Sequence, residues 1–450
     1  MKNFAAVFAC LCLISAASLV AERPSDAARF WPQWRGPDAT GVAPYADPPL
    51  EWSETKNIRW KVEIPGKGSA TPIVWDDKVF ILTAIPTGEP VEPKSSDLPQ
   101  RRGRRRRGMG IPRNMPTQVQ QFSMFAINRH DGKVLWKRIV REELPHESKH
   151  TNGTWASGSP VTDGEIVFAY FGSWGLYCFD MEGKLLWEKD LGDMTIRLGF
   201  GEGSSPALHD DKIIISWDHQ GQSFIVALDK RTGREIWRVN RDEMTSWATP
   251  IVVGHNGKKQ IITSATNRVR SYDLENGELI WESGGMTLNT IPSPVAAEGM
   301  VFVTSGFRGN ALLAIRLADA RGDISDSNAI VWRHDQDTPY TPSPLLYGDT
   351  LYFLKRNSGV LSSFKAGTGQ ENYSRKRLKD VPNVFASPVG ASNRVYITGR
   401  DGNMVVLEHG PEFKILAVNS LDDGFDASPA LVDKDIYLRG RQYLYCISED

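Results

Sequence analysis

Short apolar runs separated by polar turns occupy most of the chain, and long helical periodicity is absent beyond the first residues. In the stretch 224–237, FIVALDKRTGREIW, one apolar run ends at Asp229, Gly233 follows, and a second run ends at Trp237. The side-chain oxygen of an aspartate caps turn amides, and glycine adopts positive φ without strain. The stretch therefore predicts a β-hairpin.

This hairpin recurs, which indicates a repeat protein. The same spacing of Asp or Asn, Gly and Trp occurs at 126–136 and 271–281, and it is one residue shorter at 178–187. Upstream of the hairpins, a small residue and a proline precede a β-rich run in eight places, at Pro72, Pro160, Pro206, Pro250, Pro294, Pro344, Pro388 and Pro429. Apart from the first interval, these prolines lie 41 to 50 residues apart, a period typical of β-propeller blades with four strands each.

The number of units predicts how the ring closes. Eight units need eight fourth strands, but the chain ends soon after the third strand of the last unit. Residues 58–62, IRWKV, match the fourth-strand pattern VLWKR at 134–138. We therefore expect an all-β, eight-bladed β-propeller of four-stranded antiparallel blades, closed by the N-terminal strand because pairing the two ends removes open edges. Seven blades is the alternative if one degenerate unit fails to form.

The chain divides into three parts by composition. Residues 1–21 have one lysine, an apolar stretch and small residues near the end, which predicts a secretory signal peptide. An N-terminal extension at 22–57 and a propeller at 58–450 follow. We expect an exported protein of the periplasm or cell envelope, monomeric, with a formal net charge of −1.

An arginine-rich insertion lies within 85–120 of the first blade. Between 93 and 113, eight basic residues stand against one aspartate. Such a run does not fold by itself, and Arg101–Arg107 could dock on an anionic surface. The alternative is a solvated loop with no dedicated partner. Nucleic acid is not an expected partner of an exported chain.

The loops before the inner strands carry the candidate site, because a propeller brings them together at the mouth of its axial funnel. The side chains expected in this ring are Trp155, Arg197, Glu202, Trp247, Asn289, Tyr340 and Asp426. Of these, Glu202, Asn289 and Asp426 offer the oxygen ligands that calcium prefers. The alternative is structural: the aromatic rings pack between strands and the polar groups satisfy loop amides.

The small-x-Pro starts and the hairpin ALDKRTGREIW resemble the repeats of the pyrroloquinoline quinone (PQQ)-like propeller superfamily over about residues 58–450. The leader WPQWRGPDATGV at 31–42 is similar to the start of exported members found in Planctomycetes. The resemblance implies the fold but leaves the function open, because the superfamily includes quinoprotein dehydrogenases as well as the outer-membrane assembly lipoprotein BamB.

Two functions follow from this resemblance. The dehydrogenases hold PQQ and calcium and usually have two adjacent cysteines, which this chain lacks; it also lacks haem, zinc-protease, nucleophile-elbow and P-loop motifs. We therefore expect a non-catalytic, BamB-like scaffold that binds proteins through its blade loops, with no cofactor. The alternative is a PQQ- and calcium-dependent dehydrogenase that oxidises an alcohol or sugar. A polysaccharide-binding role is a third class, without a defensible catalytic carboxylate pair.

Overall fold

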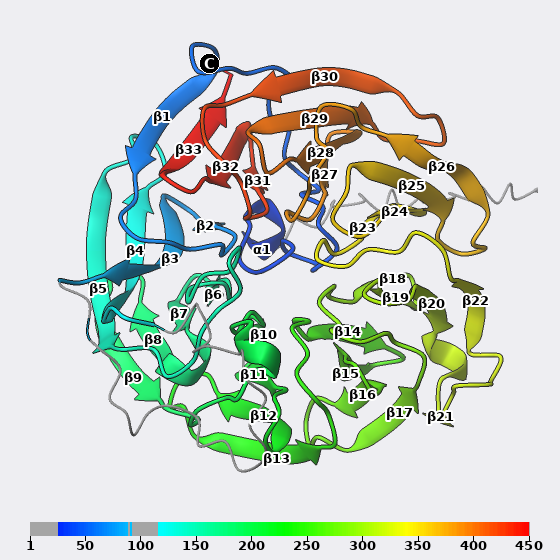
Figure 1. The fold of residues 1–450 in the computed structure, drawn as a ribbon. Helices are drawn as coiled ribbons and strands as arrows, with labels where there is room; N and C mark the ends of the chain where they lie inside the picture. The colour runs from blue at the N-terminus through cyan, green and yellow to red at the C-terminus, as the bar shows by residue number, and fades with distance from the viewer. Residues whose placement is uncertain (1–25, 89–90, 92–115, 450) are drawn as a thin grey trace, which may run out of the picture.

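The computed structural model describes residues 26–88, 91 and 116–449. The predicted signal peptide and arginine-rich segment lie outside the described residues. In the described part, eight sheets surround a central axis like the blades of a propeller (Figure 1), which confirms the predicted fold class. No helix in these ranges is long and apolar enough to cross a membrane.

Blades 1 to 4 follow one another along the chain. Blade 1 contains β2 (Ile73–Trp75), β3 (Lys78–Pro86), β4 (Gln120–Asn128) and β5 (Val134–Glu143). Blade 2 contains β6 (Val161–Thr162), β7 (Ile166–Tyr170), β8 (Leu176–Asp180) and β9 (Leu185–Lys189). Blade 3 contains β10 (Ala207–His209), β11 (Lys212–Trp217), β12 (Ser223–Asp229) and β13 (Glu235–Arg241). Blade 4 contains β14 (Ile251–His255), β15 (Lys258–Ser264), β16 (Val269–Asp273) and β17 (Leu279–Ser283).

Blades 5 to 8 complete the ring. Blade 5 contains β18 (Val295–Ala297), β19 (Met300–Ser305), β20 (Ala311–Arg316) and β22 (Ile330–His334). Blade 6 contains β23 (Leu345–Tyr347), β24 (Thr350–Leu354), β25 (Val360–Lys365) and β26 (Glu371–Arg377). Blade 7 contains β27 (Val389–Ala391), β28 (Arg394–Thr398), β29 (Asn403–Glu408) and β30 (Ile415–Ser420). Blade 8 contains β31 (Ala430–Val432), β32 (Asp435–Arg439), β33 (Tyr443–Ser448) and β1 (Ile58–Glu63).

The remaining elements are short. They are α1 (Asp26–Arg29), the 3-10 helices η1 (Gly172–Trp174), η2 (Arg197–Gly199) and η3 (Leu317–Asp319), and the two-residue strand β21 (Gly322–Asp323).

The N-terminal strand closes the ring as predicted. β1 pairs antiparallel with β33, and Trp60 lies opposite Cys446 in the register. Blade 8 thus combines the two ends of the propeller sequence, and no blade in the described chain lacks its fourth strand.

At five of the eight junctions, the recurring tryptophan joins a blade to the next one. Trp237 at the end of blade 3 donates its Nε1–H to the carbonyl of Leu274 in the turn of blade 4, at 3.0 Å. A Cβ on Gly277 of that turn would lie 2.7 Å from the indole ring, so only glycine admits this contact. The same indole-to-turn bond is made by Trp60, Trp136, Trp187 and Trp332.

Blades 6 and 7 have no tryptophan in their fourth strands. At the junction of blades 4 and 5, the tryptophan is present but makes a different bond. Blade 5 has an excursion at 316–328 in place of the glycine turn, and Trp281 bonds Gln260 of its own blade instead. The excursion supplies β21, which adds a parallel fifth strand to the outer edge of β17. Leu317, Ala320 and Ile324 bury Trp281 completely, so the insertion replaces the missing turn as its packing surface.

Candidate functional site

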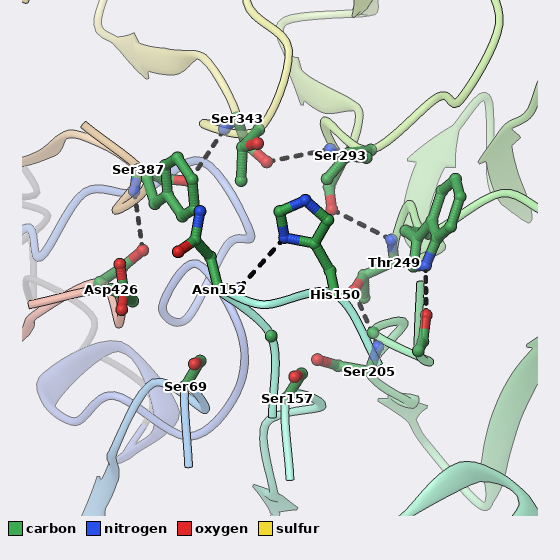
Figure 2. Close-up of a pocket in the computed structure, with 18 of the residues that line it drawn as sticks. Ser69, His150, Asn152, Ser157, Ser205, Thr249, Ser293, Ser343, Ser387 and Asp426 are labelled. Atoms are coloured by element: carbon green, nitrogen blue, oxygen red, sulfur yellow. Dashed lines mark hydrogen bonds between the residues drawn. The ribbon is translucent and has the colours of Figure 1, made fainter. Parts of the chain in front are cut away.

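A ring of hydroxyl side chains surrounds the axis, one from each blade. The residue immediately before each of the eight prolines is Ser or Thr, at Thr71, Ser159, Ser205, Thr249, Ser293, Ser343, Ser387 and Ser428. In seven of the eight junctions, the backbone N–H of this residue donates to the hydroxyl oxygen of the next blade, at 2.8–3.1 Å. Figure 2 shows the links that run from Ser205 through Thr249, Ser293 and Ser343 to Ser387. We call these residues the hydroxyl belt.

The belt explains why a hydroxyl is needed at this position. The inner strands of neighbouring blades belong to separate sheets and do not pair with one another. The backbone N–H groups that precede these strands therefore need another acceptor. A Ser or Thr hydroxyl from the neighbouring blade supplies it. The eighth link, from Ser428 to Thr71, is not formed, and Thr71 Oγ1 is buried without a hydrogen-bond partner.

The N-terminal extension fills one end of the axial channel, which we call the turn end because the turns between first and second strands lie there. Residues 33–40 share one groove with such turns from blades 3, 4 and 5. Trp31 forms an isolated bridge with Val74 of blade 1, and Val42 forms another with Gly390 of blade 7. The extension therefore connects blades that are far apart around the ring.

Arg35 anchors the extension. Its guanidinium donates to the carbonyls of Pro344 (2.6 Å), Pro388 (2.7 Å) and Thr40 (3.2 Å), and its side chain is almost fully buried. Burial lowers the pKa of this arginine to about 9. Gly41 has a φ of +92°, and the guanidinium occupies the space that a Cβ there would need. Arg35 thus holds blades 6 and 7 to the leader that the sequence singled out.

At the opposite end, which we call the loop end, a cavity of about 260 Å³ opens on the axis. Its floor includes Trp34, whose Nε1–H donates to the belt residue Ser293 at 3.1 Å. Its walls include the aromatic side chains Phe200, Trp247, Tyr340 and Phe385 and the polar residues Asn357 and Glu202. The polar residues His150, Asn152 and Asp426 also line it (Figure 2). Six of the belt hydroxyls line it as well: Ser205, Thr249, Ser293, Ser343, Ser387 and Ser428.

Four of the seven residues predicted for the funnel ring line this cavity: Glu202, Trp247, Tyr340 and Asp426. Trp155 lies behind it in a narrower pocket, and Lys149 sits 5.1 Å from the centre of its ring. Arg197 donates to the sulfur of Met244 and does not line the cavity. Asn289 is buried, with a φ of +56° and an unpaired Oδ1, and it does not line the cavity either.

The carboxyl group of Glu202 serves the loop that contains η1. Oε2 accepts the backbone N–H of Ser173 at 2.8 Å, and Oε1 accepts its hydroxyl at 2.6 Å. Burial raises the pKa of Glu202 to about 7, and the two bonds from Ser173 oppose this rise.

Asp426 is held between two arginines. Oδ1 accepts from Arg400 Nε at 2.5 Å, and Oδ2 accepts from Arg441 Nε at 3.2 Å. Both carboxylate oxygens are therefore engaged within the loop end.

The proposed calcium ligands do not form a ready donor set. The carboxylate oxygens of Glu202 accept hydrogen bonds from Ser173, and those of Asp426 accept from two arginines. Asn289 lies outside the cavity. In the described ranges, no group of three His, Cys, Asp or Glu side chains is arranged to hold a metal ion. The residues present thus do not fit a calcium-bound PQQ in the way that the resemblance implies.

Sequence reasoning missed two features of the site. The hydroxyl before each proline was visible eight times but was interpreted only as a small residue, because a single strand start does not reveal a bond to the next blade. His150, Asn152 and Asn357 reach the cavity from loops whose sequences carry no distinctive pattern. Only the ring geometry brings them together.

Comparison with known proteins agrees with this architecture. A family model described as "Outer membrane protein assembly factor BamB" matches residues 120–282 and 221–450. The outer membrane protein assembly factor BamB of Shewanella oneidensis is 24% identical over 294 residues, which cover 63% of this chain and 65% of that protein. The chain thus spans slightly less than two thirds of the length of this curated relative.

Two solved structures share the fold. The crystal structure of BamB from Moraxella catarrhalis has a TM-score of 0.52 at 13% identity, covering 72% of this chain and 91% of that one. The quinohemoprotein alcohol dehydrogenase ADHIIG from Pseudomonas putida has a TM-score of 0.53 at 11% identity, covering 94% of this chain and 76% of that one. At such identities the likeness is one of fold alone.

Proposed function

Since this chain belongs to the family of the outer membrane protein assembly factor BamB, we propose that it is an exported, non-catalytic scaffold that binds a protein partner in the cell envelope. The binding surface is the loop end, where the aromatic cavity opens. The turn end is filled by the extension.

The observation that carries this proposal is the state of the carboxyl groups at the cavity. Glu202 and Asp426 are the acidic side chains in its lining, and both are used in internal bonds. A general base needs a lone pair directed at the proton that it removes, and a metal ligand needs one directed at the ion. The aromatic walls have internal contacts as well, since Tyr340 stacks on Phe307 and Arg400 lies over the ring of Phe385. Even so, Phe200, Tyr340 and Phe385 are only half-buried and keep part of their surface open to the cavity. Aromatic rings in a desolvated recess are typical anchors for a protein segment.

The alternative remains a PQQ- and calcium-dependent dehydrogenase of alcohols or sugars. Its fold is shared with this chain, but the calcium ligands it requires would have to be released from their present partners. A dehydrogenase function therefore predicts that cofactor binding reorganises Asp426 and its two arginines.

Site-specific photo-cross-linking in the native host tests the scaffold function. A photoreactive amino acid at Phe200 places the probe in the cavity wall, whereas the same amino acid at Leu185 places it on the exposed face of β9 at the rim. We expect a discrete cross-linked protein from position 200 that is absent from position 185. The same pattern from both positions, or no product from either, would contradict a partner site at the loop end.

A further inference from the structure

A second pocket lies beside the aromatic cavity at the loop end, and its lining is basic. It has a volume of about 440 Å³ and shares Ser69, Asn152, Gly153 and Asp426 with the cavity. Five cationic side chains line it, against two carboxylates: Lys67, Lys149, Arg400, Arg439 and Arg441 face Asp401 and Asp426. They come from blades 7 and 8 and from the loops that precede the inner strands of blades 1 and 2.

The acidic residues satisfy only part of this positive charge. Asp426 pairs with Arg400 and Arg441. Among the described residues, Lys67, Lys149 and Arg439 have no carboxylate within ion-pair distance, while 29 other contacts of this kind are formed in the same part of the chain. Burial lowers the pKa of Lys149, and the nearby charge of Lys67 lowers it further. The two lysines therefore repel each other in this pocket.

Arg439 gives the strongest evidence that this pocket binds an anion. Its side chain is 1% exposed, and its Nε and Nη1 are buried without a hydrogen-bond partner. Only Nη2 has a contact, a long one of 3.5 Å to the carbonyl of Ile64. The charge of Asp423 acts on Arg439 and opposes the fall of its pKa, but no carboxylate pairs with the guanidinium directly. A buried guanidinium whose N–H groups lack acceptors is costly, and a bound anion would compensate it. The contrast with Arg35 is instructive, because that buried arginine has three carbonyl acceptors within 3.2 Å.

We propose that this basic pocket binds an oxyanion of the phosphate class. A phosphate dianion matches three unpaired cations better than a single carboxylate does, and its oxygens accept several donors at once. Besides the cations, Thr151 and Asn152 line the pocket and offer neutral donors. Small movements of the Arg439 side chain would bring the unused N–H groups of its Nε and Nη1 onto the anion. This inference does not depend on the scaffold function.

Calorimetric titration with inorganic phosphate at pH 7 tests the proposal, with chloride used to keep the ionic strength constant. The wild-type chain should bind one phosphate, and thermal unfolding should shift upward with phosphate but not with chloride. A parallel titration with methyl phosphate identifies the source of the ligand. Equal affinity would indicate the phosphate group of a larger molecule, and much weaker binding would indicate free phosphate.

Two variants make the test specific. Arg439→Met removes the buried charge and should abolish the phosphate response while raising the thermal midpoint in chloride, since an uncompensated cation is lost. This gain separates a lost site from a damaged fold. Lys149→Gln should weaken phosphate binding about tenfold, the equivalent of one charge-assisted hydrogen bond.

The matched control is Arg375→Gln. Arg375 lines another basic pocket, but it is already paired with Asp337 at 2.7 Å, so this variant should bind phosphate like the wild type. The proposal is wrong if phosphate gives no more stabilisation than chloride. It is equally wrong if Arg439→Met binds phosphate with the affinity of the wild type.

Discussion

The two ends of the axial channel use the same kinds of residue in opposite ways. At the turn end, Arg35 is buried and each of its terminal nitrogens has a carbonyl acceptor. At the loop end, Arg439 is equally buried, yet two of its nitrogens have none. The aromatic residues differ in the same way: Trp31 of the N-terminal extension is fully buried, whereas Tyr340 lies half-exposed in the cavity wall.

This contrast separates stability from function within one fold. At the turn end, the carbonyl acceptors of the Arg35 guanidinium fix the extension to the ring, although Arg35 Nε and Trp31 Nε1 are buried there without a partner. At the loop end, the unpartnered nitrogens of Arg439 belong to a side chain that lines a pocket and can serve a ligand. The account therefore predicts large stability losses for substitutions at the turn end and in the belt, and small ones at the cavity.

The largest loss of stability is expected from Arg35→Ala. It leaves buried carbonyls of blades 6 and 7 without a donor and creates a cavity, which should cost about 3–5 kcal/mol of unfolding free energy. Urea denaturation measures this loss. Arg29→Ala, at an exposed position in α1, is the control and should change stability by less than about 0.5 kcal/mol. Equal midpoints for the two variants would show that the extension does not hold the ring.

The hydroxyl belt is tested by a pair of identical substitutions. Thr249→Val removes the acceptor of the Ser205 N–H and should cost about 1–3 kcal/mol, because a buried donor is left unpaired. Thr71→Val removes a hydroxyl that has no partner, so it should change stability by no more than about 0.5 kcal/mol. Thermal or urea unfolding of both variants gives the comparison. If Thr71→Val were as destabilising as Thr249→Val, the conclusion that the Thr71 hydroxyl has no hydrogen-bond partner would be wrong.

Glu202 predicts a pH dependence of stability. Its pKa is raised from about 4.5 to about 7 by burial, so between these values the folded chain binds a proton that the unfolded chain has released. The free energy of unfolding therefore falls as the pH rises from about 4.5 to 7, and the penalty is complete above pH 7. Glu202→Gln mimics the protonated acid and should remove this part of the decline. Parallel pH profiles for wild type and variant would contradict a buried, proton-holding carboxyl group.

The smallest effect on stability is expected in the cavity wall. Tyr340→Ala removes a ring that stacks on Phe307 at 4.9 Å and should cost about 1 kcal/mol or less. It should nevertheless weaken the cross-link formed from position 200, since both residues line the same cavity. A large stability loss with an unchanged cross-link would show that Tyr340 stabilises the fold and does not bind the partner, contrary to the role given to the loop end.

The repeat geometry could be predicted because it depends on local signals. The grid of Asp229, Gly233 and Trp237 specifies a turn and a packing residue, and the match of 58–62 to a fourth strand predicted the closure. The cavity lining was only partly predictable. Trp247 and Tyr340 follow from their place before inner strands, but the side chain of Asn289, two residues before Ile291 of the cavity lining, is buried elsewhere.

The basic pocket could not be predicted, because its parts are remote in sequence. Lys149 and Arg439 are separated by most of the chain, and each is an ordinary basic residue in its own segment. Their lack of partners is a property of the folded ring. Likewise, the two arginines that occupy Asp426 come from the second-to-third strand loops of blades 7 and 8, so the sequence did not show that this carboxylate is engaged.

A titration of the purified chain, without its first 21 residues, with PQQ and Ca²⁺ decides between a scaffold and a dehydrogenase. It is followed by absorbance and by oxidation of alcohols and sugars with an artificial electron acceptor. Because Glu202 and Asp426 are committed to internal bonds, we predict neither stoichiometric cofactor binding nor turnover. Tight one-to-one binding with turnover would contradict the scaffold function and make the loop end an active site.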